Sequence, residues 1–345
     1  LGSNTTASNN TAIGYVALVA NTTGASNVAV GASSLDANTE GSNNTGVGFN
    51  ALTSNTTAAG NTAVGYNSLA ANTTGASNTA VGSGALDAST TGASNVAVGL
   101  NSMTSNTNGY ENTAVGKDSL ASCTEGFENT AIGHNCGAAI TTGDNNTFVG
   151  NAAGQANTTA GANTAVGNAA LASNTTGATN NAFGANALDA CTTGARNNGF
   201  GYRALASATT GYYNTAIGHQ AGDDITDGFK NICIGHDADI SAGNNQHTIV
   251  IGESITAASN DFSFGKASNV VTNDFDADAN WSRSSDERLK KNITNQTLGL
   301  DFINDLRTVK YNWKASNELD STDAELSHLY KEDAADNEMN TSAVM

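Results

Sequence analysis

The residues at 61–65 read Asn-Thr-Ala-Val-Gly, and the same five residues stand 17 positions later at 78–82. A fixed period of this length is the signature of a stacked repeat architecture. Glycine keeps this period fifteen times, at Gly14, Gly31, Gly48, Gly65, Gly82, Gly99, Gly116, Gly133, Gly150, Gly167, Gly184, Gly201, Gly218, Gly235 and Gly252. The spacing therefore predicts a shaft of fifteen 17-residue coils over residues 1–252.

A column of asparagine accompanies the column of glycine. Asparagine stands four residues before fourteen of the fifteen glycines, and only Thr248 breaks the column. Stacked asparagine amides hydrogen-bond from layer to layer in cross-β assemblies, so we expect a structural ladder here. The middle of the predicted ladder is formed by Asn61, Asn78 and Asn95 with Gly65, Gly82 and Gly99.

The residues between the columns predict a mainly β fold, a parallel β-roll. Thr-Ala-Val alternates β-branched residues with a small one, as in a short strand, and Leu four residues after the glycine marks a second apolar point. Thr-Thr-Gly, as at 73–75, predicts a turn whose glycine takes positive φ. We expect two short strands and two turns in each coil. The chain has no proline, so every residue keeps a backbone donor for the stack.

A single roll of this kind buries little. Seventeen residues make a loop about 56 Å around, which encloses only a few side chains. The small face, as at Ala63 and Ala80, is expected to let sister chains approach closely. We therefore predict a homotrimeric fibre, about 70 Å long over its fifteen coils at the usual strand spacing.

Composition excludes several partners. The net charge of −18 opposes bulk electrostatic binding to nucleic acid or an anionic membrane. No run approaches the ~20 apolar residues of a membrane span, so no membrane insertion is expected. Cys123 and Cys191 share a repeat position about 19 Å apart, so the four cysteines are expected to be reduced. We expect no cofactor and no metal.

Some columns left functional alternatives open. Threonine holds the position eight residues after thirteen consecutive glycines, which indicates either a turn that bonds its own backbone or an exposed array that binds ice or sugar. His134, His219 and His236 each follow a column glycine. A metal ladder and solvated surface side chains are both compatible with them. We favour the surface interpretation, because no carboxylate or cysteine has matching spacing.

Aromatic residues and paired acids are the residue types that could form carbohydrate sites in this chain. Tyr110 with Phe127, and Tyr212 with Phe229, share a register in adjacent coils, which suits either a sugar-binding patch or rings that fill the surface. The surface-filling interpretation is preferred. The neighbouring pair at 223–224, two aspartates, is expected to point to opposite faces, so it gives no carboxylate pair for glycan cleavage.

The repeat resembles the head repeats of trimeric autotransporter adhesins and the related β-rolls of phage tail fibres. The resemblance rests on Asn-Thr-Ala-Val-Gly, as at 112–116 and 163–167, followed by Ala-Leu or Ser-Leu. It covers residues 1 to about 252. The resemblance implies a left-handed parallel β-roll in a threefold stalk or head.

The pattern changes after Gly252. The next similar strand, 262–265, comes only 13 residues later, so a domain boundary is expected, with 253–284 as a connector. A charged segment follows. Residues 298–307 predict a short helix, and alternating apolar residues at 309–313 predict a strand, the start of a small α+β domain.

The stretch 285–313 resembles the intramolecular chaperone auto-processing domain at the end of phage tailspikes and fibres, also classed as peptidase family S74. Ser-Asp-Glu-Arg-Leu-Lys at 285–290, the following Asn-Ile and Tyr-Asn-Trp-Lys carry the resemblance. It implies a single-turnover serine self-endopeptidase in which Ser285 attacks the Ser284–Ser285 bond with help from Lys290. The alternative is that Ser284 or Ser285 only caps a helix.

The leading prediction is a structural and adhesive fibre in the virion, which recognises a host-surface glycan or protein and carries a C-terminal trimerising chaperone. Residues 285–345 are expected to be the N-terminal part of that chaperone domain, truncated, because no heptad follows Trp313. The start of the chain is expected to lie inside a repeat. The alternatives are the head or stalk of a bacterial trimeric adhesin on the cell surface, and the shaft of a glycan-depolymerising tailspike.

Overall fold

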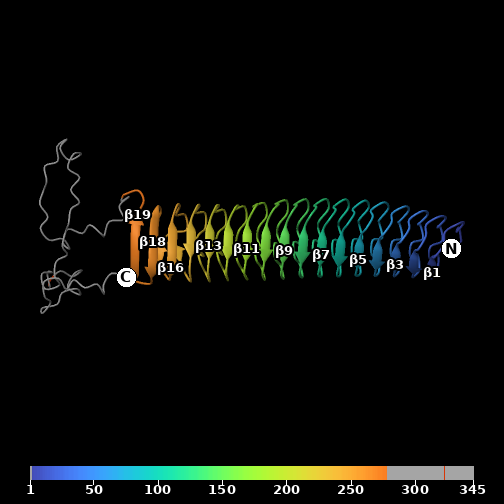
Figure 1. The fold of residues 1–345 in the computed structure, drawn as a ribbon, viewed down its shortest axis with the longest axis horizontal. Coiled ribbons are helices and arrows are strands. Elements are labelled where there is room, and N and C mark those ends of the chain that lie inside the picture. The colour runs from blue at the N-terminus through green and yellow to red at the C-terminus, as the bar shows by residue number, and fades with distance from the viewer. Residues whose placement is uncertain (1, 278–321, 323–345) are drawn as a thin grey trace, which may run out of the picture. The chain divides into compact units, whose positions relative to one another are not determined.

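The computed structural model describes residues 2–277 and 322. The first of two compact units, Leu1–Asp276, is a parallel β-solenoid whose strands follow one another along a single axis from β1 to β19 (Figure 1). The described residues contain no helix, and so none that has the length and apolar character to cross a membrane. The mainly β class and the coils of 17 residues are thus confirmed.

Each regular coil contributes one short strand, and the strand pairs in parallel with its neighbour 17 residues along the chain. The strands of three residues are β1 (Thr11–Ile13), β2 (Val28–Val30), β3 (Thr45–Val47), β4 (Thr62–Val64), β5 (Thr79–Val81), β6 (Val96–Val98), β7 (Thr113–Val115), β8 (Thr130–Ile132), β9 (Thr147–Val149), β10 (Thr164–Val166), β11 (Asn181–Phe183), β12 (Asn198–Phe200), β13 (Thr215–Ile217) and β14 (Ile232–Ile234). At the C-terminal end stand β15 (Asp239–Ile240), β16 (Ile249–Glu253), β17 (Thr256–Ala257), β18 (Asp261–Lys266) and β19 (Asn269–Asp274).

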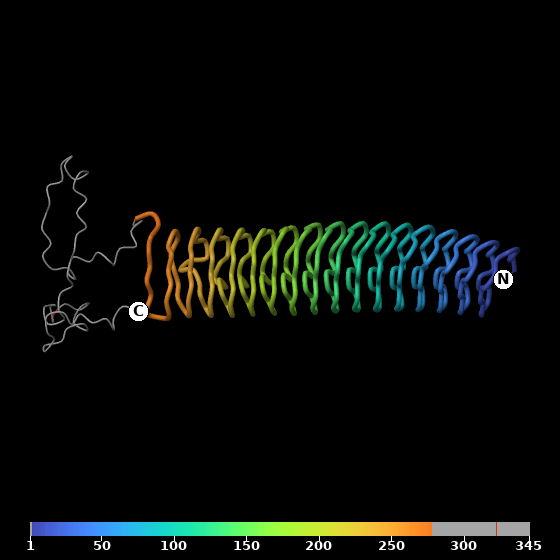
Figure 2. The backbone as a smooth tube through the Cα atoms, viewed as in Figure 1, coloured from blue at the N-terminus to red at the C-terminus, as the bar shows by residue number. Residues whose placement is uncertain are grey.

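The prediction of a second strand in each regular coil was wrong. The apolar residue at that point lies in a turn with positive φ, +50° at Leu69 and +52° at Leu86. The left-handed conformation folds the chain back within the small circumference of the coil (Figure 2). Hydrogen bonds between coils continue there, since the Leu69 N–H donates to the Ala85 carbonyl at 3.0 Å.

The alanines of the strands point into the coil, which corrects the expectation that they face sister chains. Ala63 and Ala80 are fully buried, whereas Val64 and Val81, next along the strands, are 36% exposed. The interior is too narrow for larger side chains at this position in most coils. Alanine and leucine from successive coils form one continuous core, and the β-branched residues face outward.

Two glycine columns are required for close packing between coils. A Cβ on Gly65, at φ +143°, would collide with the carbonyl of Gly82 in the next coil. The prediction of a positive φ at the turn glycine was wrong, because the φ of Gly75 is not positive. A Cβ on Gly75 would instead collide with the Gly92 carbonyl and lie 2.6 Å from the Asn72 side-chain oxygen.

The asparagine side chains connect the coils along the whole stack. The Asn78 N–H donates to Asn61 Oδ1 at 2.9 Å, and Asn61 Nδ2 donates to the Gly75 carbonyl at 2.9 Å. A second asparagine column, which the sequence analysis missed, lies seven residues after the glycine. There Asn72 Nδ2 donates to Asn55 Oδ1 at 2.9 Å. The signal for it was the repetition of asparagine at 21, 38, 55 and 72.

The threonine column is bonded from coil to coil. The Thr73 hydroxyl donates to the Thr90 carbonyl at 3.1 Å, and most of the column from Thr22 to Thr209 repeats this bond with the next coil. The acceptor is thus the neighbouring coil and not the residue's own turn. This structural role accounts for the column.

In one part of the core, a large residue stands at a position that is usually small, and glycine stands at two nearby positions that are usually leucine. Phe148 occupies a strand position that holds alanine or glycine in most other coils, and it is fully buried. Glycine replaces the usual leucine at Gly137 and Gly154, where a Cβ would lie against the Phe148 ring. The ring therefore fills the volume that the two absent side chains leave.

Stacking continues beyond the boundary expected at residue 252. The coil after Gly252 is four residues shorter, yet Gly252 pairs with Gly265 and β18 stays parallel to β16. β19 then returns antiparallel to β18 and ends the ladder. Much of the expected connector 253–284 is therefore part of the solenoid, because a shorter turn can still keep the strand in register.

Replacing Gly116 by Ala is expected to lower the free energy of unfolding by about 2 kcal/mol or more, because the new Cβ would collide with the Gly133 carbonyl at φ +134°. Urea unfolding followed by circular dichroism measures this. Gly60→Ser is the matched control, since a Cβ on Gly60, at φ +73°, would meet no atom closer than 3.7 Å, and serine holds a similar conformation at Ser77. Equal losses in both variants would contradict the packing argument.

Candidate functional site

The predicted self-cleavage residues lie outside the described residues. This applies to Ser285 and Lys290, and to Ser284 on the other side of the predicted scissile bond. The predicted helix and strand at 298–313 lie outside them as well. The functional geometry that the structure does describe is at the C-terminal coils of the solenoid.

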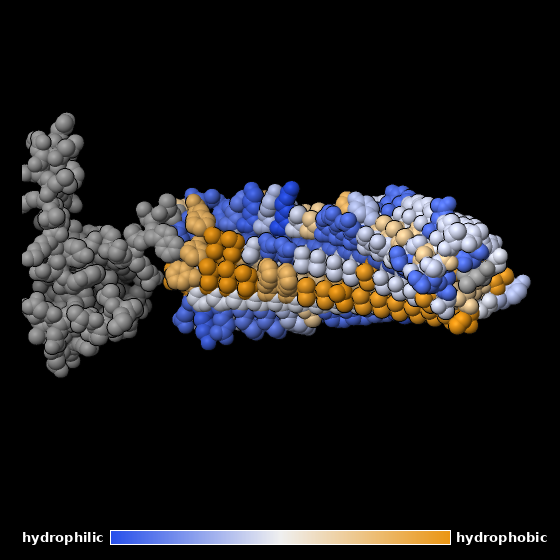
Figure 3. Space-filling view, turned by 45° about the vertical axis from the view of Figure 1, so that its right-hand side comes forward, coloured by the Kyte–Doolittle hydropathy of each residue, from blue (hydrophilic) through white to orange (hydrophobic). Residues whose placement is uncertain are grey.

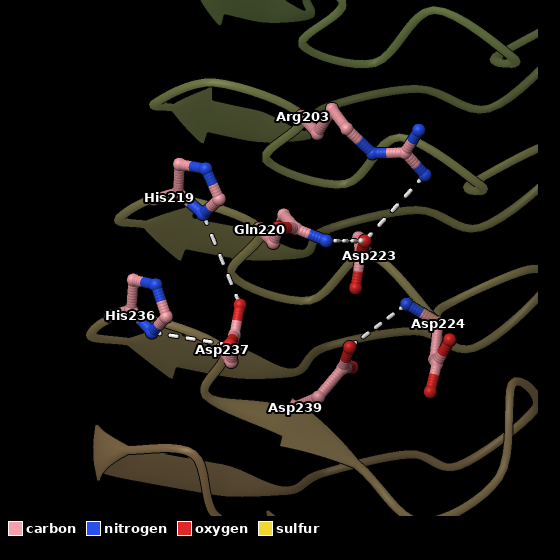
Figure 4. Close-up of polar contacts among 8 residues, drawn as sticks. All are labelled: Arg203, His219, Gln220, Asp223, Asp224, His236, Asp237 and Asp239. Carbon is pink, nitrogen blue, oxygen red and sulfur yellow. Dashed lines mark hydrogen bonds and ion pairs between the residues drawn. The ribbon is translucent and has the colours of Figure 1, made fainter.

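These coils carry charged side chains at positions where most other coils have uncharged residues. Asp239 stands four residues after its column glycine, where most coils have leucine. Asp223 stands five residues after its column glycine, Gly218. Asp237 stands two residues after its own column glycine, and the same position holds Arg203 and Gln220 in the two preceding coils. Figure 4 shows that their side chains gather into two polar groups on neighbouring coils.

Asp239 is a buried carboxyl group at a core position. It is 6% exposed, and it accepts hydrogen bonds from the backbone N–H of Asp224 at 2.9 Å and of Ile240 at 2.7 Å. Burial raises the pKa of Asp239 to about 7, and the nearby carboxylates of Asp224 and Asp223 add to the rise. A carboxyl group with this pKa holds its proton over much of the acidic range.

The expectation that Asp223 and Asp224 point to opposite faces was wrong. They lie in a turn and not in a strand, and their carboxylates converge with Asp239 so that one oxygen of each lies within 4.8 Å of the others. Arg203 lies 3.7 Å and Gln220 Nε2 3.2 Å from the Asp223 carboxylate. Because Asp239 is buried, a sugar substrate cannot reach it, and this group gives no support to glycan cleavage.

The second polar group consists of His219, His236 and Asp237. The two imidazoles stack with ring centres 5.0 Å apart and planes inclined by 11°. Nδ1 of His219 lies 3.9 Å from one oxygen of Asp237, and Nδ1 of His236 lies 3.1 Å from the other. This carboxylate was not predicted from the sequence, because Asp237 is offset by one residue from the histidine column. The third histidine, His134, faces an amide in Asn151 at 3.1 Å.

An aromatic-basic patch lies at the other end of the same strands, formed by Arg196, Tyr212, Tyr213, Phe229 and Lys230. Tyr212 and Phe229 stack face to face at 4.9 Å, as the shared register predicted. The Arg196 guanidinium lies 5.1 Å above the Tyr213 ring and donates to its hydroxyl at 2.8 Å. Lys230 Nζ lies 5.9 Å from the Phe229 ring centre. Both tyrosines are exposed, so rings and cations are accessible together.

All four cysteines are free and buried, as expected. Burial raises the pKa of Cys123 to about 11 and of Cys191 to about 12, so neither thiol is a nucleophile at neutral pH. Each occupies the position of the second asparagine column, where its Sγ lies 3.7 Å or less from a turn carbonyl. Their role is packing of the core.

Comparison with known proteins gives one family match. The family model described as Chaperone of endosialidase, Peptidase_S74, matches residues 285–328. A comparison of the sequence with curated proteins gives no match. The match and the β-solenoid that precedes it fit a phage tail fibre or tailspike with a C-terminal chaperone domain, as the sequence predicted.

Proposed function

We propose that this chain forms the shaft of a homotrimeric, adhesive virion fibre whose C-terminal chaperone assembles the trimer and then cleaves itself off. The observation that carries the proposal is the chaperone match at 285–328, which follows a solenoid of in-register coils. Such a match implies association into trimers. Presentation of a host-recognition surface is the function that a long rigid shaft on a virion serves.

The solenoid explains why a chaperone is needed. Neighbouring coils present nearly identical columns of Asn, Gly and Thr, so one chain can slip by a whole coil against another at little cost in contacts. A C-terminal trimerising segment holds three chains at a common starting point while the coils associate. Removal of that segment afterwards leaves the trimer kinetically trapped.

The outward face of the strands offers a surface for the sister chains. The residue just before each column glycine, and before Gly265, is apolar and at least partly exposed, which gives a stripe about 70 Å long at the usual strand spacing. Figure 3 shows this stripe as a continuous orange band along the solenoid. Its members are Ile13, Val30, Val47, Val64, Val81, Val98, Val115, Ile132, Val149, Val166, Phe183, Phe200, Ile217, Ile234, Ile251 and Phe264.

An apolar stripe of this length is unusual on the surface of a monomer. Contact with two further copies of the chain would remove it from water over its whole length. The stripe, and not the alanine face, is the proposed contact between chains, because the alanines are buried inside each chain. The straight, in-register course of the stripe fits a partner with the same repeat.

Self-cleavage requires one nucleophile and one base. In the proposed reaction, Ser285 Oγ attacks the carbonyl carbon of Ser284 while the Lys290 amine accepts the hydroxyl proton. The proton passes to the departing Ser285 nitrogen, and the peptide bond is replaced by an ester. Water then hydrolyses the ester, which leaves a carboxylate at Ser284 and a free amine at Ser285. The family match begins at residue 285, which supports this position for the new N-terminus.

We expect cleavage after Ser284, and Ser285→Ala and Lys290→Ala are expected to reduce its rate at least about 100-fold. Intact mass spectrometry of the purified subunits measures the outcome. Ser284→Ala is the matched control and should still cleave, since this residue supplies only the carbonyl group. Cleavage that persists in Ser285→Ala, or none in the unaltered protein, would leave the segment as a trimerising module at most and would favour the adhesin alternative.

The double variant Val64→Asp and Val81→Asp is expected to convert the trimer into monomers, because it buries two carboxylates in each chain at the proposed interface. Native mass spectrometry and light scattering measure the assembly. Thr74→Asp, an exposed turn position in the same part of the shaft, should leave the trimer intact. A trimer that survives the double change while both variants stay folded would place the interface elsewhere.

We infer that the aromatic-basic patch is the receptor surface and that it takes an acidic glycan. Exposed rings stack on the apolar faces of sugars, and guanidinium and ammonium groups pair with carboxylates. The chain has only 13 lysines and arginines against 31 acids, so two cations beside stacked rings form a local exception to its charge.

Substituting Arg196 and Tyr213 by Ala is expected to reduce binding to carboxylated glycans at least about tenfold, because ring and cation are lost together. A glycan array that contains neutral and acidic sugars, followed by calorimetry, measures this. The stacked pair Tyr110 and Phe127 is the matched control, since it has the rings without a cation stacked on them. Equal binding of neutral sugars, or no effect of the Arg196 change, would refute the acidic specificity.

A further inference from the structure

We propose that His219, His236 and Asp237 form a binding site for a divalent transition-metal ion of the Zn²⁺ type, with one ion in each chain. The three side chains come from two adjacent coils. They offer two imidazole nitrogens and one carboxylate, each with one ligand atom within 4.8 Å of the others. The site is independent of the proposed self-cleavage and of the glycan surface.

The distances suit a metal. Imidazole nitrogens and carboxylate oxygens bind Zn²⁺ at about 2.0–2.2 Å, so the ligand atoms around one ion stand about 3–4 Å apart. Nδ1 of His236 and Nδ1 of His219 lie 3.1 and 3.9 Å from the two oxygens of Asp237. A small rotation of the exposed imidazoles is enough to close the group on an ion. Figure 4 shows both rings directed at the Asp237 carboxylate, which lies toward them from the lower coil.

The solenoid arranges these ligands in advance. His219 and His236 occupy the same column, so the stacking of the coils holds their rings parallel. The Asp237 N–H donates to the His219 carbonyl at 3.0 Å, which ties the carboxylate residue to the neighbouring coil. Asp237 also has positive φ, +49°, in the turn after the glycine. Little ordering of the backbone remains to be done when an ion binds.

The ligand set selects the class of ion. Two imidazoles and one carboxylate are typical of Zn²⁺, Co²⁺, Ni²⁺ and Fe²⁺ sites, whereas Ca²⁺ and Mg²⁺ prefer oxygen ligands alone. The neighbouring acids add negative potential around the group, which favours a cation. The side chains of His219 and His236 are 47% and 56% exposed, so the remaining coordination positions face solvent and can hold water or an external ligand.

An ion at this position bridges two successive coils close to the end of the regular repeat. It binds the folded stack and not the unfolded chain, so it stabilises these coils by mass action. The aromatic-basic patch lies on the same coils, at the opposite end of strands β13 and β14 from the histidines. The expected consequence is a shaft terminus that resists opening where the coil length changes.

The chain contains its own control for the proposal. His134 has the same column position as His219 and His236, but its neighbour in the next coil is Asn151, so it lacks a second imidazole and a carboxylate partner. Asparagine stands in the histidine column at Asn151 and Asn168, which shows that the position accepts it without loss of the fold. The variants His219→Asn and His236→Asn are therefore compatible with the stack.

The test is titration of the untagged, metal-free full-length chain with Zn²⁺ by calorimetry, and with Co²⁺ by visible absorption. We expect one ion per chain, no thiolate charge-transfer band, and no comparable binding of Ca²⁺ or Mg²⁺. His219→Asn, His236→Asn and Asp237→Asn should each weaken Zn²⁺ binding at least about tenfold, whereas His134→Asn should not change it. Zn²⁺ should raise the thermal unfolding midpoint of the unaltered chain and not that of Asp237→Asn.

Several results would overturn the proposal. One is Zn²⁺ affinity in the unaltered chain that is no higher than in His219→Asn while circular dichroism shows both folded. Another is binding that His134→Asn weakens as much as the site variants do. A Co²⁺ spectrum with thiolate bands would assign the ion to cysteines instead.

Discussion

The close contact between successive coils is the constraint on which the rest of the structure depends. At the column glycines the backbone of one coil lies so near the carbonyl of the next that no Cβ fits, as at Gly116 against Gly133. This contact keeps the stack in register, and the register in turn brings each Asn side chain to the N–H of the next. The buried Asn ladder and the threonine bonds repeat from coil to coil because the 17-residue period does not change before Gly252.

A regular scaffold of this kind makes departures from the repeat informative. Over most of the shaft the columns repeat the same small set of residues, and their side chains are used to hold coils together. In the last regular coils, positions outside the Asn and Thr columns hold His, Asp, Arg and aromatic residues, which the same register aligns into groups. A metal group and an aromatic-basic patch thus arise at opposite ends of the same strands, without any loop or additional domain in the described part of the chain.

The regularity that stabilises the shaft also creates its assembly problem. Each regular coil exposes an apolar residue just before its column glycine, so three chains in the proposed trimer could associate in many registers of similar energy. The repeat itself carries no information that selects one register. In the proposed fibre, a separate segment that joins the chains at one end supplies it, and residues 285–328, which match the family model described as Chaperone of endosialidase, are the candidate for that segment.

The sequence by itself determined the 17-residue period, the β class, the position of one strand in each coil, and the first Asn column and the Thr column, because a repeat of fixed length can be read directly from the order of the residues. It also indicated the chaperone segment from the residues at 285–290. Only the tertiary structure decided that the alanine face of each strand is buried and that the leucine four residues after most column glycines lies in a turn with positive φ. It also decided that Asp223, Asp224 and Asp239 converge. It alone paired His219 and His236 with Asp237. These facts depend on how a narrow coil bends and on contacts between residues about 17 apart in different columns, which local patterns do not encode.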